Sequence, residues 1–322
     1  MRIVRTLVLA ALALALPALP STAQDYPNRP IRFIVPFPPA SAVDIVARAL
    51  GGRMSPALGQ PIIVENRPGA GGRLGADLVA KAVPDGYTIL IQSSAHASIP
   101  ALYKDVSYDT TKDFAGVTTL VNLPNVLIVA PDKGFKTLRD LVAWAKANPG
   151  KLNFASAGIG SATHMNLEKF CARAGIKVTH VPFKGTSEVL PDLMSGRVDA
   201  YFVPLSAGVP YIRDNRVGVL AVGTAQRSAL LPDVPTTIES GVPESDYNLW
   251  MGMLVPAATP RPLIARLNAE TLKALHSPEL AERLKALGAM TMPSTPEQFD
   301  AYIRAEIVSI GEVVKAAGIQ PN

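Results

Sequence analysis

Cysteine, dense basic runs and long apolar spans are scarce in this chain of 322 residues, and each shortage excludes a class of protein. A single cysteine, Cys171, rules out an internal disulfide, and its helical context predicts a small buried side chain rather than a nucleophile. No dense Lys and Arg run follows the first residues, so nothing indicates nucleic-acid binding. The apolar run from Leu7 to Leu16 is too short for a membrane span of about 20 residues.

Motifs typical of enzymes and cofactor-binding proteins are also missing. Gly69, Gly71, Gly72 and Gly75 do not follow the G-x-G-x-x-G spacing of dinucleotide sites, and no Walker lysine follows a glycine. The stretch GIGSA at 158–162 is not a G-x-S-x-G elbow, and H-E-x-x-H does not occur. The histidines are widely spaced, whereas zinc needs at least three convergent ligands. We therefore expect neither catalysis nor a cofactor nor a metal.

The first 23 residues have the pattern of an export signal. Arg2 and Arg5 precede the apolar run, prolines end it, and Ser21-Thr22-Ala23 has small residues where signal peptidase cuts. The alternative is an uncleaved amphipathic anchor. Cleavage would lower the net charge from +5 to +3, because the segment contains two arginines and no acid. We expect residues 1–23 to be removed and the protein to lie in the periplasm.

Predicted strands and helices alternate nearly throughout, which indicates α/β units with mostly parallel sheets. The first unit has strands at 31–35, 62–65 and 88–92 and helices at 44–58 and 75–83. After a linker, strands are predicted at 126–130, 152–155, 178–182, 199–203 and 217–222, with helices at 137–148 and 161–174. The last part has a strand at 248–255 and then helices at 260–275, 278–287 and 296–317, each with proline in its first turn.

This change of pattern predicts two lobes joined by two crossings, near Leu123 and near Ser245. Lobe 1 would contain residues 24–123 and 246–322, and lobe 2 would contain residues 124–245. Trp144 and Trp250 fall on apolar faces and are predicted to be core residues.

Four turns rich in small residues follow predicted strands and precede predicted helices, at 36–42, 67–75, 155–163 and 182–187. Ligands of open α/β sheets bind at the carboxyl ends of strands, where helix N-termini and consecutive N–H groups attract anions. A hydrogen bond to a charged group contributes about 1.5–3 kcal/mol. Three or four such bonds approach the roughly 8 kcal/mol of micromolar binding without any cationic side chain.

The first of these turns, FPPASAVD at 37–44, fits such a site. Its prolines fix the turn, its small residues let a ligand approach the backbone, and Asp44 is predicted to cap the helix. The alternative is a helix start without a ligand, because the charge of Asp44 disfavours an anion. In the later turns, His164 would make either a ligand contact or a structural hydrogen bond, and Lys184 would meet an anion or face solvent.

Several long motifs in a fixed order carry a family resemblance. They are YPNRPIRFIVPFPPASAVDIVARAL, QPIIVENRPGAGGRLGADLVAKAVPDGYTIL, LNFASAGIGSATHMNLEKF, VPFKGTSEVLPDLMSGRVDAYF and LAVGTAQRSALLPDVPTTIESGVP. Together they resemble the Bug family, the periplasmic receptors of tripartite tricarboxylate transporters, over essentially the whole chain after the export signal. The resemblance implies an α/β periplasmic-binding-protein fold of the Venus-flytrap type, with two lobes and a mostly parallel sheet flanked by helices in each.

In this family one ligand carboxylate is typically held by main-chain groups and ordered waters of the first proline-rich loop and the glycine loop. The resemblance therefore implies a set of ligand-binding residues: Phe37, Pro38, Ala40, Ser41, Ala70, Gly71, Ser93, Ser94, Ser156, Gly158, Ser161, Thr163, His164, Lys184 and Gly185. Many relatives have Gly-Gly where Ala40-Ser41 stands. Alanine and serine restrict the backbone angles more than glycine does, and Ser41 also adds a hydroxyl group.

The function implied by the resemblance is capture of a small carboxylate between the lobes, without conversion, for a two-subunit membrane permease. Family ligands include dicarboxylates, tricarboxylates, amino acids and aromatic acids, and we expect a monomeric receptor. One alternative is an extracytoplasmic sensor subunit for a membrane kinase, which would have the same fold. Another is an exported hydrolase that pairs Ser156 or Ser161 with His164, although the elbow motif and an orienting acid are missing.

Overall fold

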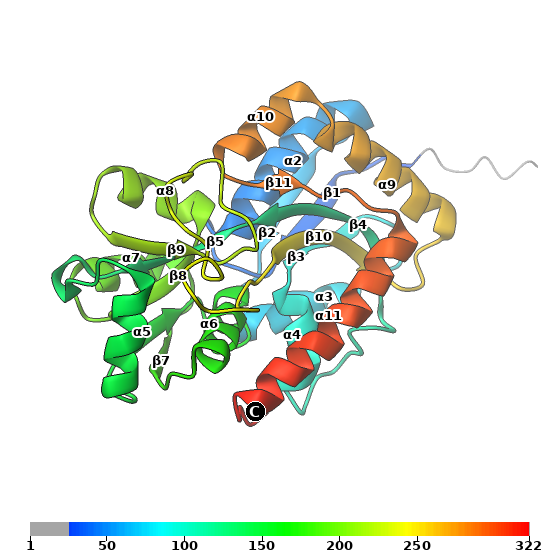
Figure 1. The fold of residues 1–322 in the computed structure, drawn as a ribbon. Coiled ribbons are helices and arrows are strands. Elements are labelled where there is room, and N and C mark those ends of the chain that lie inside the picture. Colours follow the sequence, from blue (N-terminus) through cyan, green and yellow to red (C-terminus); the bar gives the residue numbers. More distant parts are fainter. Residues whose placement is uncertain (1–25, 322) are drawn as a thin grey trace, which may run out of the picture.

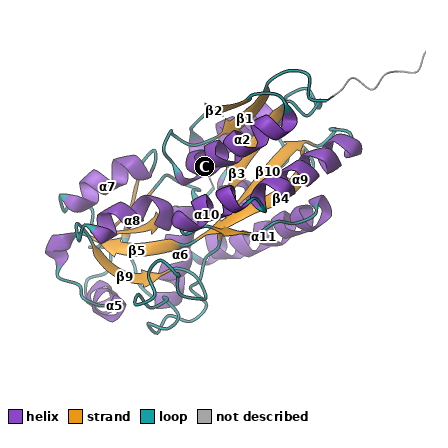
Figure 2. Ribbon diagram, turned by 90° about the horizontal axis from the view of Figure 1, so that it is seen from above, coloured by secondary structure: helices purple, strands orange, loops and turns teal. Residues whose placement is uncertain are grey.

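The chain forms two sheets, each flanked by helices on both faces, as the computed structural model shows (Figures 1 and 2). The structure describes residues 26–321, so the predicted export signal lies outside the described residues. Within residues 26–321, no helix combines the length and the apolar character needed to cross a membrane. The predicted two-lobed α/β fold is confirmed, but the sheets are mixed and not mostly parallel as predicted, because β10 and β5 run antiparallel to both of their neighbours.

The sheet of lobe 1 is built from both ends of the chain. Its order is β11-β4-β10-β3-β1-β2, with bounds β1 Ile31–Val35, β2 Ile62–Asn66, β3 Thr88–Ser93, β4 Phe114–Leu123, β10 Leu249–Pro256 and β11 Met290–Thr291. Strand β10 runs antiparallel to both neighbours, whereas β1 is parallel to β2 and β3. The helices of this lobe are α2 Ala42–Leu58, α3 Arg73–Ala80, α4 Ala95–Leu102, α9 Arg261–Leu275, α10 Pro278–Ala286 and α11 Pro296–Ala316.

The sheet of lobe 2 has the order β7-β6-β8-β5-β9. Its strands are β5 Asn125–Val129, β6 Asn153–Ser156, β7 Thr179–Pro182, β8 Ala200–Pro204 and β9 Gly218–Val222, and its helices are α5 Leu138–Ala147, α6 Ala162–Ala174, α7 Thr186–Met194 and α8 Leu205–Arg213. Alternate residues of β5 enter different cores: Leu127 and Val129 pack with α5 and α6, whereas Val126 and Ile128 pack with α7 and α8. A fully buried strand in such a layered sheet has no polar face.

Two segments connect the lobes. Strand β4 passes into β5 with only Pro124 between them, and the return path runs from β9 to β10. The N–H of Gly223 donates to Asn125 O at 2.8 Å, and the N–H of Tyr247 donates to Gly223 O at 2.7 Å, so the two connections lie together. We propose these connections as the lobe boundaries that the sequence places near Leu123 and Ser245.

The sequence predicts a linker before residue 126, and this prediction was wrong because the stretch contains regular structure. It holds α4 and the ten-residue β4, and β4 shows no alternation because nine of its residues are buried. Helices α4, α7 and α8 each contain a proline, which obscures their pattern. Trp250 is fully buried as predicted, but the prediction for Trp144 was wrong, since 39% of it is exposed; its ring packs edge-on with Phe135.

Ala40 has a left-handed backbone conformation, with φ of 62°. For a residue with a Cβ this conformation costs about 1–2 kcal/mol, whereas glycine adopts it freely. This chain therefore keeps a glycine-like turn at Ala40 despite the side chain.

Replacing Ala40 by glycine should stabilise the protein by up to about 1 kcal/mol, because the relief of strain exceeds the added flexibility of the unfolded chain, about 0.4–1 kcal/mol. Urea unfolding measures the change. Ala47→Gly, inside α2, is the control and should destabilise by about 1 kcal/mol. A less stable Ala40→Gly protein would contradict the strain assigned to this turn.

His96 lies in α4 with none of its surface exposed and packs edge-on against Phe114, with ring centroids 4.9 Å apart. Burial lowers the pKa of His96 to about 4, from an ordinary value of 6.5. The unfolded chain therefore binds a proton at this residue between pH 6.5 and 4 that the folded chain does not bind. Linkage then makes stability fall as the pH falls through this window.

His96→Leu should flatten this decline, which His96 steepens by up to about 1.4 kcal/mol per pH unit. Urea midpoints measured between pH 7 and 4 provide the test. His276→Gln is the matched control, because His276 is exposed and its Nδ1 contacts only Leu272 O of its own helix. Equal slopes in wild type and His96→Leu would refute the assignment.

Candidate functional site

Two adjoining cavities lie between the lobes, and Phe37, Pro38 and Ala157 line both. The deep cavity, about 40 Å³, is lined by Phe37, Pro38, Ser41, Ala42, Val43, Ser93, Ala157, Ser161, Ala162, Thr163, Gly185, Thr186, Pro204, Leu249 and Met251. The outer cavity, about 720 Å³, is lined by Pro36, Phe37, Pro38, Pro68, Gly69, Ala70, Gly71, Gly72, Tyr103, Ala157, Gly158, Ile159, Pro182, Phe183, Lys184 and Glu188. The deep cavity has room for a few water molecules, since one water needs about 10–15 Å³ of such space.

Three helices point their N-termini at the deep cavity. Ala42 and Val43 are the first residues of α2, Ala162 and Thr163 begin α6, and Thr186 begins α7 after Gly185. The N–H groups of the first helical residues have no acceptor within their helix, and the helix dipole places positive potential there. Among residues 26–321, no Lys, Arg, Asp or Glu lines this cavity. Its positive character therefore comes from the backbone.

The start of α2 corrects the predicted cap. Ser41 is the N-cap, with its hydroxyl accepting from the N–H of Asp44 at 3.3 Å. Asp44 lies three residues into the first turn, where its carboxylate accepts from the N–H of Ala40 and the amide of Asn66, both at 2.9 Å. Serine and aspartate both favour the N-cap position, so the sequence alone did not separate Ser41 from Asp44. The structure does, because the backbone of Ser41 is extended, as an N-cap requires.

The negative charge of Asp44 is satisfied within lobe 1. Arg48 lies 3.0 Å from the Asp44 carboxylate, which is only 4% exposed. Burial by itself raises the pKa of Asp44, but the hydrogen bonds from Arg48, Asn66 and Ala40 outweigh it and hold the pKa below its ordinary value. The carboxylate is therefore ionised and paired, and it does not line the cavities. The predicted conflict between Asp44 and a bound anion is thus reduced by geometry.

The loop before α6 is held by its own side chains. Ser161 caps α6 by accepting from the N–H of His164 at 3.3 Å, and the hydroxyl of Thr163 accepts from the N–H of Ala157 at 2.9 Å. Gly158 has φ of 120° and presents its backbone to the outer cavity. These bonds fix the loop so that the N–H groups of α6 stay directed at the deep cavity.

Behind this loop, His164 and His180 stack with ring centroids 4.1 Å apart and planes 16° apart. The N–H of Gly160 donates to His164 Nδ1 at 3.2 Å, so a neutral His164 carries its proton on Nε2, which lies 3.3 Å from a Glu168 oxygen. His164 thus makes structural hydrogen bonds, one of the two roles considered from the sequence. Burial, together with the charge of His164, lowers the pKa of His180 to about 3.

Histidine, cysteine, aspartate and glutamate side chains can bind metal ions. In the described part of the chain, His164, Glu168 and His180 form the one group of these side chains that is compact enough to hold a metal ion. Two features oppose this. A ligating nitrogen directs its lone pair within the ring plane, and near-parallel stacked rings do not share one target. The proton on His164 Nε2 also occupies the position a metal would need. The donor set therefore suits a hydrogen-bonded network better than a metal.

The hydrolase alternative paired His164 with Ser156 or Ser161, but the imidazole at Ser156 belongs to His180. Ser156 Oγ lies 2.6 Å from His180 Nε2, and it also accepts from the N–H of Gly158 at 3.2 Å. Ser156 has no exposed surface. A histidine with a pKa of about 3 is a weak general base near neutral pH, and a fully buried hydroxyl does not reach a substrate.

Most of the predicted ligand-binding residues meet at the two cavities. Phe37, Pro38, Ser41, Ser93, Ser161, Thr163 and Gly185 line the deep one, and Ala70, Gly71, Gly158 and Lys184 line the outer one. Four residues line neither: Ala40, Ser94, Ser156 and His164. Ser94 is buried and its hydroxyl accepts from Tyr247 OH at 3.1 Å. These four position the loops from behind.

Sequence reasoning missed several lining residues, among them Tyr103, Pro204 and Met251. Tyr103 falls in the stretch predicted as a linker, Pro204 is the last residue of β8 in lobe 2, and Met251 lies inside β10 of lobe 1. No local motif marks them, because only the assembled sheets bring them together.

The lobes touch across the cleft. Ser98 Oγ of α4 donates to Gly160 O at 2.6 Å, and Tyr103 OH donates to Ile159 O at 3.3 Å. Gly71 has φ of 63°, and a Cβ there would lie 2.5 Å from Ile159 O. These contacts join the two lobes beside the cavities.

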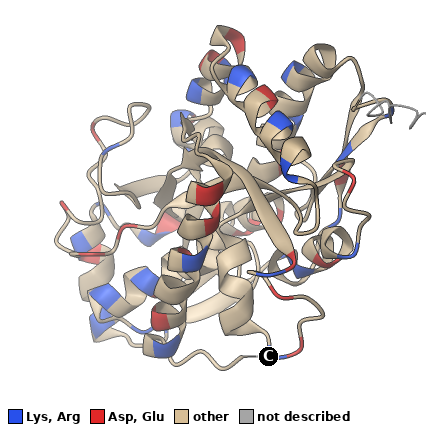
Figure 3. Ribbon diagram, turned by 90° about the vertical axis from the view of Figure 1, so that its right-hand side faces the viewer, with Lys and Arg blue, Asp and Glu red and all other residues tan. Residues whose placement is uncertain are grey.

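Charged residues lie mostly on helices and loops, and both signs are interspersed there (Figure 3). Lys184 is an exposed cation at the outer cavity, and its backbone N–H donates to Glu188 at 3.1 Å. The outer cavity therefore contains one cation and one anion, whereas the deep cavity contains neither.

Comparison with known proteins agrees with this architecture. The family model described as "Tripartite tricarboxylate transporter family receptor" matches residues 46–319. The "UPF0065 protein in tcbD-tcbE intergenic region" of Pseudomonas sp. (strain P51) is 41% identical over 306 residues, which cover 94% of this chain and 91% of the relative.

Three solved structures are similar over nearly the whole chain. The periplasmic binding protein BugD has a TM-score of 0.87 and 33% identity, covering 92% of this chain and 100% of its own. R. palustris Rpa4515 with adipate has a TM-score of 0.88 and 32% identity at the same coverage. MatC from Rhodopseudomonas palustris with bound malate has a TM-score of 0.83 and 33% identity, covering 90% and 100%. The chain therefore belongs to the tripartite tricarboxylate transporter receptor family of periplasmic solute-binding proteins, which includes the Bug proteins.

Proposed function

We propose that this receptor captures a small carboxylate between its lobes and presents it, unchanged, to a two-subunit membrane permease of the tripartite tricarboxylate type. The observation that carries the proposal is the convergence of the N-termini of α2, α6 and α7 on a deep cavity without charged lining. Free N–H groups at helix starts bind carboxylates well. Charge-assisted bonds from two lobes together reach the energy of micromolar binding.

The two cavities suggest how the ligand would lie. One carboxylate would enter the deep cavity, beside the N–H groups of Ala42, Val43 and Ala162, and the body of the ligand would lie in the outer cavity toward Lys184. Rpa4515 was solved with adipate and MatC with bound malate. Both compounds are dicarboxylates, which supports this class of ligand. A second carboxylate would meet Lys184 more favourably than an uncharged end.

Capture would depend on closure, because the donors belong to different lobes. A ligand shifts the lobes toward the closed state only through contacts that exist in that state. The bonds from Ser98 and Tyr103 to the α6 loop belong to this state and would hold the cleft shut. The closed surface formed by both lobes is then the one that a permease recognises. A sensor subunit would use the same closure, and only the partner distinguishes the two.

We further propose that the mature receptor is a periplasmic monomer that begins after residue 23. The signal-like pattern of the first residues and the periplasmic setting of similar proteins support export. The buried Ser156 and the low pKa of His180 argue against the hydrolase alternative.

Adipate and malate should raise the melting temperature of the mature protein, since a ligand at 100 times its Kd adds about 2.7 kcal/mol of stability. Adipamide, which keeps the length of adipate without its charge, is the matched control and should have no effect. Thermal unfolding followed by calorimetry measures both. If no member of a wider panel of di- and tricarboxylates, amino acids and aromatic acids stabilises the protein, carboxylate capture is wrong.

Ala42→Pro tests the main-chain donors directly. Proline suits the first helical position, and Ser41 already has the extended backbone that precedes proline, so the fold should survive without this N–H group. Loss of one charge-assisted hydrogen bond should weaken carboxylate binding at least tenfold.

Calorimetry with the best carboxylate of the panel measures the affinity. Ala42→Gly keeps the N–H group, adds no atom to the deep cavity and should bind about as tightly as wild type does. A folded Ala42→Pro protein with unchanged affinity would show that the α2 N-terminus does not hold the ligand.

A further inference from the structure

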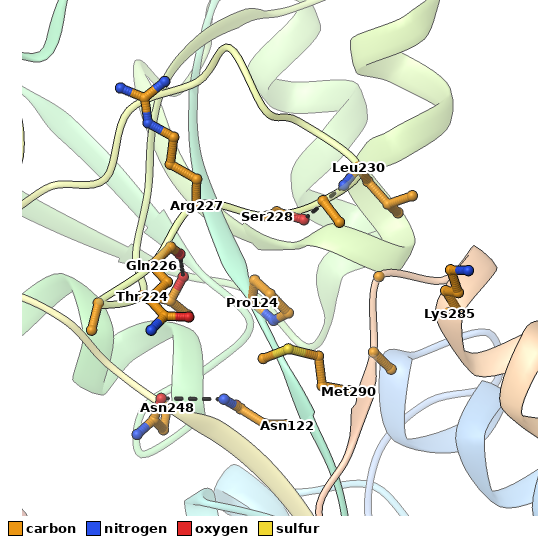
Figure 4. Close-up of a pocket in the computed structure, with 14 residues that line it drawn as sticks. Asn122, Pro124, Thr224, Gln226, Arg227, Ser228, Leu230, Asn248, Lys285 and Met290 are labelled. Carbon is orange, nitrogen blue, oxygen red and sulfur yellow. Dashed lines mark hydrogen bonds between the residues drawn. The ribbon is translucent and has the colours of Figure 1, made fainter.

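A third cavity between the lobes lies on the side of the two lobe connections. It has a volume of about 310 Å³ and is lined by Asn122, Pro124, Thr224, Ala225, Gln226, Arg227, Ser228, Ala229, Leu230, Asn248, Lys285, Gly288, Ala289 and Met290 (Figure 4). None of these residues lines the two cavities of the cleft. We call this space the hinge cavity. Its size falls at the lower end of small-molecule sites.

Three parts of the fold build the hinge cavity. Asn122, Pro124 and Asn248 belong to the lobe connections, the loop 224–230 follows β9 of lobe 2, and residues 285–290 join α10 to β11 in lobe 1. The turn at Gly288 is an interlobe contact, since a Cβ there would lie 2.6 Å from Leu205 of α8. The shape of the hinge cavity therefore depends on the angle between the lobes.

The wall of the hinge cavity combines apolar surface with positive charge. Pro124, Leu230, Ala289 and Met290 supply apolar side chains, and 59% of Met290 is exposed. Figure 4 shows the side chains of Met290 and Pro124 between Asn122 and Leu230. A large exposed methionine on a two-residue edge strand is covered by nothing in the described chain, and an apolar ligand body would bury it.

The charges of the lining favour an anion. Arg227 and Lys285 are the charged residues of the wall, and no Asp or Glu lines it. Arg227 is already paired with Glu239, at 2.9 Å. The Lys285 amine is 3.8 Å from Glu282, and about three quarters of each side chain is exposed, so this pair holds the lysine weakly. Lys285 is thus available to a ligand.

We propose that the hinge cavity is a second binding site, for an amphiphilic organic monoanion whose charged group meets Lys285 and whose apolar body covers Met290. The exposed amides of Gln226 and Asn248 complete the wall with polar groups. Because both lobes contribute, the occupant binds one lobe angle better than another, and its affinity is linked to closure of the cleft. The hinge cavity shares no lining residue with the cleft, so an anion can bind there whether or not the cleft binds a carboxylate.

The test uses 8-anilinonaphthalene-1-sulfonate, a fluorescent monoanion with an apolar ring body, titrated into the mature protein. Saturable emission with one site is expected for wild type. Lys285→Glu and Met290→Asp should each weaken this binding at least tenfold, because they place negative charge at the two proposed contacts. Both side chains are largely exposed, so both variants should fold.

Two matched controls separate the site from general charge effects. Lys146→Glu makes the same charge change in the last turn of α5, as Lys285→Glu does in α10. Met292→Asp changes a methionine that is 36% exposed two residues beyond Met290 and does not line the cavity. Both should bind the probe as wild type does. Absence of saturable binding, or equal affinity in all four variants, would overturn the proposal.

Discussion

The unsatisfied N–H groups at the starts of α2, α6 and α7 are the constraint on which the rest of this structure depends. A helix start that faces a cavity needs acceptors, and three such starts meet in a space without charged side chains. The surroundings keep these donors free of competing charge. The Asp44 carboxylate, in the first turn of α2, does not line the cavity and is paired with Arg48 and Asn66. The positive potential in the deep cavity therefore comes from the backbone.

This arrangement explains why the sequence predicted the loops well and their detailed roles less well. Small residues between a strand and a helix predict a ligand-binding turn wherever they occur, so Phe37, Gly71, Gly158 and Gly185 were found at the cleft. Residue type alone did not separate the capping Ser41 from Asp44, because only backbone angles and partners distinguish them.

Strand β4 and helix α4 were not predicted from the sequence, and each was missed for a physical reason. Strand β4 is buried almost throughout and lies between other strands, so it lacks the alternation that marks a strand with one polar face. Helix α4 is short and contains Pro100. Tyr103, just after α4, and Met251, in β10, reach the cleft only because the sheet of lobe 1 is completed by the end of the chain. Such long-range assembly leaves no local signal.

The two lobe connections lie side by side at Asn125, Gly223 and Tyr247. The middle of the chain therefore leaves lobe 1 and returns to it at nearly the same place, as an inserted domain does in its host. Residues 125–247 form one continuous segment with adjacent ends and two cores of their own, the geometry that favours autonomous folding. Lobe 1, in contrast, draws strands from both parts of the chain that flank this segment and acquires a complete sheet only after β11, at Met290–Thr291, has been synthesised.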